Sequence, residues 1–253
     1  MAFAVGALAL PPGASAQSGV LRVPPVKIPL DVKGQPVPLT ASATLTLSSK
    51  ERGLRTVDVE LVGDLSGLQQ NLTALLSSAL DKDDRCANRI AVQNATLTPA
   101  EPSAVAVVQL HAERWVCARV LGRRIEKKLI GGDAQIRIRL TPEVGEDHAS
   151  LRLVPQVEDI QANSSLGEAL RSGAFGDTIR EKIQSAILSA LQKGTNVGAT
   201  LPPAVQGYVT IRNALFRDGG GGRLLAVLDG EARITQEQAR LLTDQVEERL
   251  GEH

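Results

Sequence analysis

The chain has 253 residues, with 28 lysines and arginines balanced by 28 aspartates and glutamates and only 2% aromatic residues. A neutral balance argues against electrostatic capture of nucleic acid, and so few rings argue against stacking of bases or sugars as a main binding mode. The length allows one large core or two modest ones, and the apolar residues available to fill them are mainly aliphatic.

The first residues, MAFAVGALALPPGASAQ, resemble the apolar part of a secretory signal with a small-residue cleavage site at residues 14–16. The basic stretch that normally opens such a signal is missing, and an Ala/Pro-rich disordered leader or a lone anchor is the alternative. The apolar run is about ten residues, too short to span a bilayer. We therefore expect a periplasmic or otherwise exported protein with no transmembrane span, whose signal peptide is residues 1–16.

The next stretch, residues 17–41, is rich in proline and is expected to be an extended lead-in. Within it residues 26–32 alternate, and Pro29 limits them to an edge strand because proline lacks a ladder donor. Residues 42–253 are expected to form a single domain. Period-two alternation predicts strands at 43–48 and 56–61 that pair as a hairpin.

A leucine stripe predicts a helix that starts at Asp64 and ends before the charged run at residues 81–85. Such a stripe usually faces a core. From Arg89 to Val120 the period returns to two, with a turn near residues 99–102. Both faces of the second of these strands are apolar at its start, which predicts that this part is covered on both sides.

A basic cluster follows, formed by Arg123, Arg124, Lys127 and Lys128. We interpret it as a solvated hairpin tip, with a lipid-headgroup site as the less favoured alternative. Alternation predicts further strands at 134–140 and 149–160.

The most regular helix is predicted from Asp177 to Lys193, with Asp177 as its cap, after a short helical piece at 166–171. Beyond it, a strand at 208–213 leads into four glycines at 219–222 and a return strand. These glycines match no phosphate-binding motif and predict a hairpin turn. A final helix is expected to be capped by Thr235.

The chain's two cysteines, Cys86 and Cys117, favour a disulfide if the protein is exported, and two buried free thiols in a cytosolic protein are the alternative. Neither belongs to a CxxC pair, so a zinc site is poorly supported. The three histidines are scattered, and neither HExxH nor GxSxG occurs. We therefore expect no metal, no cofactor and no enzymatic activity, with a hydrolase assembled from distant segments as a weaker alternative.

Long strands with one aliphatic face and two striped helices predict an α+β fold, in which a long curved antiparallel sheet is wrapped around amphipathic helices. If the facing sides stay apart, they form an apolar groove for a lipid or another aliphatic ligand. If they close, the protein is a structural or interaction protein with a filled core. It would then bind a partner, such as another envelope protein, through its polar sheet face or its last helix.

The order of elements carries a resemblance to a known family. The segments that carry it are, in order, IPLDV, GLQQNLTALLSSAL, RWVC, TIREKIQSAILSAL, LPP and VTIRNALFRDGGGGRLLAVLDG. Over residues 26–232 this order resembles the TULIP superfamily of tubular lipid-binding proteins (SMP and BPI-like), and in particular an uncharacterised exported bacterial branch. The resemblance implies an acyl-chain tunnel between sheet and helix. The residues that would line it are Leu68, Leu72, Leu75, Leu76, Ile136, Ile138, Ile179, Ile183, Ile187 and Leu191.

Overall fold

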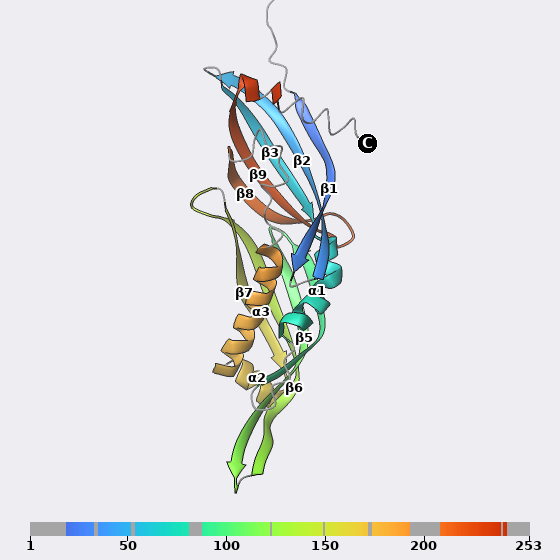
Figure 1. Ribbon diagram of the computed structural model, residues 1–253, viewed down its shortest axis with the longest axis vertical. Coiled ribbons are helices and arrows are strands. Elements are labelled where there is room, and N and C mark those ends of the chain that lie inside the picture. Colours follow the sequence, from blue (N-terminus) through green and yellow to red (C-terminus); the bar gives the residue numbers. More distant parts are fainter. Residues whose placement is uncertain are drawn as a thin grey trace, which may run out of the picture.

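The computed structural model describes residues 19–32, 35–51, 54–80, 88–121, 123–148, 150–171, 174–192, 208–238 and 240–241. Over these ranges the fold is α+β and dominated by antiparallel strands. The strands form two sheets that follow one another along the long axis of the molecule (Figure 1). The predicted α+β class is therefore confirmed. The structure differs from the predicted single curved sheet in having two sheets.

One sheet has five strands in the order β1-β2-β3-β9-β8, and the other has four in the order β4-β5-β6-β7. The five-stranded sheet consists of β1 (Val20–Val32), β2 (Gln35–Glu51), β3 (Leu54–Asp64), β8 (Val209–Asp218) and β9 (Leu224–Thr235). The four-stranded sheet consists of β4 (Asn88–Ala100), β5 (Ser103–Val120), β6 (Arg123–Val144) and β7 (Leu151–Ala162). The helices are α1 (Ser66–Leu80), α2 (Ser164–Arg171) and α3 (Ala174–Gln192).

The buried residues form two hydrophobic clusters. The larger cluster fills the space between the helices and the four-stranded sheet, and it also includes Val37, Phe216 and Leu224 of the five-stranded sheet. The smaller one covers a face of the five-stranded sheet and includes Leu45 and Val57, and none of the described side chains of α1, α2 or α3 belongs to it. The strands form two sheets and not one because β3 pairs with β9, and not with the next strand β4, along its whole length from Leu54↔Thr235 to Asp64↔Leu225. Local alternation carries no information about such a distant partner.

The proline-rich stretch is extended, as predicted, but it belongs to the sheet rather than leading into it. Residues 20–32 form β1, and β2 begins at Gln35 with Val37 and Leu39 buried. The pairing of β1 with β2 shifts register between Val23 and Val26, where the chain carries consecutive prolines. Among the described strands β1 pairs with β2 alone, and an edge strand tolerates the missing donors.

The two long helices predicted from the sequence, α1 and α3, both form, and the predicted start is confirmed for α1 alone. Asp64 accepts a hydrogen bond from the backbone N–H of Ser66 at 2.8 Å, which places it at the start of α1 as expected. The cap predicted for α3 is wrong, because α3 begins at Ala174 and Asp177 lies inside its first turn. There Asp177 forms an ion pair with Arg180. Gly176 allows this first turn to lie close to α2, since a Cβ at that position would collide with the backbone of Leu170.

The predicted hairpins are confirmed. Glu101 and Pro102 form the turn between β4 and β5. At the start of β5 the neighbouring residues Ala104 and Val105 are both buried, so this part of the strand is covered on both sides, as predicted. Gly220, Gly221 and Gly222 all have positive φ in the turn between β8 and β9, a conformation that glycine adopts without steric cost because it lacks a Cβ. Thr235 and Gln238 cap each other's backbone N–H groups, and residues 242–253, where the sequence predicts the rest of a helix, lie outside the described residues.

Strand β8 and helix α1 connect the two sheets. In β8, the backbone N–H of Phe216 donates to Pro102 at 2.8 Å, and that of Ile211 donates to His148 at 2.7 Å. In α1, the Gln69 amide donates to Leu97 of β4 and to Gly222 in the β8–β9 turn, at 2.8 and 2.9 Å. The Gln69 carbonyl accepts from the backbone N–H of Leu224 at 2.9 Å. The two sheets are thus joined by directional bonds.

Candidate functional site

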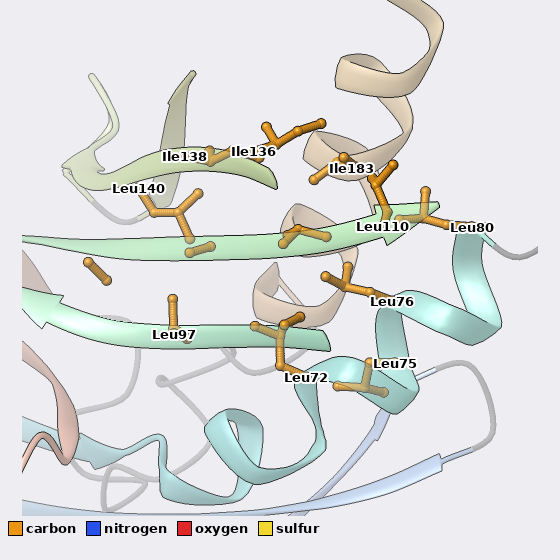
Figure 2. Close-up of a cluster of buried hydrophobic side chains, with 14 of the residues drawn as sticks. Leu72, Leu75, Leu76, Leu80, Leu97, Leu110, Ile136, Ile138, Leu140 and Ile183 are labelled. Carbon is orange, nitrogen blue, oxygen red and sulfur yellow. The ribbon is translucent and has the colours of Figure 1, made fainter. Parts of the chain in front are cut away.

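The region that the sequence singled out for ligand binding lies between α1, α3 and the four-stranded sheet. The two helices contact each other and cover the same side of this sheet (Figure 1). Figure 2 shows Leu76 and Leu80 of α1 and Ile183 of α3 gathered around the strand that carries Leu110. The apolar helix faces and strand faces that the sequence pattern identifies therefore meet in the structure.

Helix α1 is held in place by polar contacts as well as by its leucines. Thr73 accepts from the backbone N–H of Ala95 at 2.9 Å and donates to the carbonyl of the same residue at 3.2 Å. Gln69 binds Leu97 two residues farther along β4. These bonds fix the orientation of α1, so its leucine stripe faces the sheet. Helix α3 meets the same interior through Ile179 and Ile183, which are fully buried.

Eight of the ten candidate lining residues have described side chains, and all eight are exposed by 5% or less. They are Leu68, Leu72, Leu75, Leu76, Ile136, Ile138, Ile179 and Ile183. An open tunnel would leave surface exposed along its walls, so these side chains pack against one another and their neighbours in a closed interior. The side chains of Ile187 and Leu191, although on α3, lie outside the described residues.

The chemistry of this interior is almost purely aliphatic. Apart from Phe216, the buried members of its cluster are leucines, isoleucines, valines and alanines. Among the described residues Ser103 is the one buried polar side chain, and its hydroxyl lies 2.9 Å from that of Thr141. A polar metabolite would lose its hydration here without gaining hydrogen bonds, whereas an alkyl chain would lose nothing.

A polar network covers the opposite face of the four-stranded sheet. The imidazole Nδ1 of His111 lies 2.8 Å from Asp133 Oδ1, which also accepts from Gln93 at 2.9 Å. Glu113 accepts from Trp115 Nε1 at 2.7 Å and from Lys128 at 2.9 Å. The guanidinium of Arg89 lies over the Trp115 ring, 4.5 Å from its centroid.

These contacts shift the titration of the groups involved. Hydrogen bonds from Lys128 first, and then from Trp115, lower the pKa of Glu113 to about 2. The hydrogen bond to Asp133 is the main reason that the pKa of His111 is raised above 6.5, although burial opposes it. The same bond lowers the pKa of Asp133. Farther along this face, Arg137 and Arg139 lower the pKa of Glu158.

Sequence inspection missed this network and treated the histidines as scattered. The signal was present, because His111, Glu113 and Trp115 alternate on one face of β5, and the hairpin register places Asp133 opposite His111. The second imidazole nitrogen, Nε2, lies 3.4 Å from Glu113, so both ring nitrogens face carboxylates rather than a nucleophile. Within the described ranges, no group of three or more His, Cys, Asp or Glu side chains is placed to hold a metal ion.

We expect His111→Gln to remove a pH-dependent part of the stability, by less than about 1 kcal/mol because the pair is exposed. A raised folded-state pKa means that the stabilisation is fully present below pH 6.5 and is lost as pH rises through the higher folded value. The groups that face the imidazole are Asp133 and Glu113. Urea unfolding of both proteins at pH 5.5 and 8.5 measures the difference, and a histidine titration at or below 6.5 would contradict it.

The other predicted features stand as follows. Cys117 lies half-buried on β5, but Cys86 and the proposed signal segment lie outside the described residues, so the disulfide and export remain predictions. In the described part of the chain, no helix combines the length and hydrophobicity needed to cross a membrane. The chain matches no family model, no curated protein and no solved structure.

Proposed function

We propose that the protein is an exported, non-catalytic envelope protein that binds or shuttles lipid acyl chains, or another aliphatic ligand, between α1, α3 and the four-stranded sheet. The observation that carries the proposal is the composition of this interior. Two helices cover one sheet face with aliphatic side chains, and Ser103 is the one buried polar residue of the described chain. An alkyl chain is the ligand class that such a surface can accept without leaving a polar group unpaired.

The proposal includes a TULIP-like arrangement of these three elements, with the five-stranded sheet as a neighbouring unit. It also requires a conformational change, because the described lining is closed. Helix α3 is the element that we expect to move. Ile179 and Ile183 contribute contacts without directional requirements, which an acyl chain can replace, whereas Thr73 and Gln69 tie α1 to β4.

The test is the ligand content of protein purified from an exporting host. Native mass spectrometry followed by solvent extraction is expected to find bound phospholipid or fatty acid, and delipidated protein is expected to take up a fluorescent fatty acid. Ile183→Trp should reduce this uptake by adding volume to the interior, whereas the volume-conserving Ile183→Met should retain it. Clean apoprotein that takes up no fluorescent fatty acid would overturn the proposal.

The burial of the lining residues supports a second candidate function. If the closed interior is permanent, the protein is a non-enzymatic structural or interaction protein with a filled core. Its working surface would then be the polar face of the four-stranded sheet, where Arg137 and Arg139 both bind Glu158. Absence of ligand, together with binding to an envelope protein that Arg137→Glu abolishes, would favour this function.

A further inference from the structure

The hairpin formed by the far ends of β5 and β6, residues 114–130, extends beyond the helices at one end of the molecule (Figure 1). We call it the distal hairpin. Its basic residues predict a solvated tip. The side chains show a second property, since four of the large hydrophobic residues exposed in the described chain lie here. They are Val116 at 41%, Leu121 at 99%, Ile125 at 51% and Leu129 at 49%.

The strand register explains why these residues are uncovered. Val116 and Ala118 continue the side of β5 that carries the buried Ala112, and Ala118 pairs with Ile125 of β6. Closer to the body of the protein this side packs against the helices. Along the distal hairpin the sheet face continues past them, so its apolar residues meet solvent. Leu121 lies at the turn itself, with φ of 50°, a left-handed conformation in which leucine is uncommon.

The charge of the distal hairpin is one-sided, although the whole chain is neutral. Between Arg114 and Ile130 there are six basic residues and one acidic residue, Glu126. Lys128 is paired with Glu113, whereas Arg119, Arg123 and Lys127 are exposed and have no ion pair in the described structure. A concentrated positive charge of this kind attracts an anionic surface.

We propose that the distal hairpin docks the protein onto an anionic lipid bilayer. Leu121 would enter the interfacial region first, followed by Ile125, while Arg119, Arg123 and Lys127 bind lipid phosphates. An apolar apex flanked by cations at the end of a long molecule fits a flat, negatively charged surface. The proposal does not depend on lipid carriage in the interior, because it concerns a different end of the four-stranded sheet.

The test is co-sedimentation of the full chain with vesicles. The wild type is expected to bind vesicles of phosphatidylcholine with phosphatidylglycerol, and to bind pure phosphatidylcholine vesicles or anionic vesicles in 0.5 M salt on the order of tenfold less. Leu121→Asp is expected to lower binding on the order of tenfold. Aspartate also tolerates a left-handed conformation, so this change does not strain the turn.

Two further variants sharpen the result. The double variant Arg123→Glu/Lys127→Glu is expected to lose binding to anionic vesicles, with unchanged circular dichroism and melting temperature. Leu54→Asp is the matched control, because Leu54 is a leucine of the other sheet exposed by 45% and should leave vesicle binding unchanged. Equal binding by the wild type and Leu121→Asp would overturn the proposal. So would absence of vesicle binding together with self-association that the hairpin variants abolish, which would make the tip a protein contact.

Discussion

Ile136→Ala is expected to lower the free energy of unfolding by about 2–5 kcal/mol. Ile136 is fully buried on β6, opposite Val108 of β5 and Ile160 of β7, within the cluster that joins the sheet to the helices. Truncation loses the free energy gained by transferring the side chain from water to the interior, and it leaves a cavity that the surrounding strands cannot fill. Urea unfolding followed by circular dichroism measures the change.

The same strand provides the control. Ile125 also lies on β6, but it is exposed by 51%, so Ile125→Ala should change stability by less than about 0.5 kcal/mol. A loss for Ile136→Ala as small as that expected for Ile125→Ala would mean that the interior around Ile136 is not closely packed. An open ligand tunnel in the purified protein is one state that would produce this result, so the comparison also bears on the proposed function.

Gln69→Leu is expected to destabilise the protein by about 2–3 kcal/mol, because one side chain makes three hydrogen bonds across the junction of the two sheets. Its loss leaves the backbone N–H of the fully buried Leu224 and the carbonyl of Leu97 without their described partner. The replacement adds apolar surface at a position with partial burial, which does not compensate for an unpaired buried donor.

The neighbouring glutamine is a matched control for this prediction. Gln70 is exposed on the same helix, so Gln70→Leu should leave the unfolding free energy within about 0.5 kcal/mol of the wild type. Thermal unfolding of both variants tests the difference. Equal melting temperatures would show that water replaces the Gln69 hydrogen bonds without cost, and the contacts through β8 would then be the main connection between the sheets.

The sequence predicted the local elements of this fold because each has its own pattern. The stripe of α1, the alternation of β6 around Ile136 and the glycines at 219–222 all specify structure within a few residues. It did not predict that β3 pairs with β9, since period two identifies a strand and its faces but not its neighbour. Nor did it predict that the first turn of α3 begins before Asp177 and packs against α2 through Gly176, a contact that only tertiary structure creates.

The candidate site was predictable to the same extent. Periodicity identified the residues that face the interior, such as Leu72 and Ile183, because burial and periodicity have the same origin. Whether the interior is open depends on close packing between distant segments, which no local pattern encodes. The network around His111 and Asp133 also escaped notice, since it requires the register of a hairpin whose strands are read separately in the sequence.

Both edges of the five-stranded sheet are poor templates for strand addition by another copy of the chain. Strand β8 already donates N–H groups of Ile211 and Phe216 to the turns of the other sheet, so it is a poor template for an incoming strand. The opposite edge is β1, and Pro24, Pro25 and Pro29 deprive it of donors for continuous pairing. Intermolecular strand addition, which leads to fibrils and precipitation at high concentration, is thus disfavoured at both borders of this sheet.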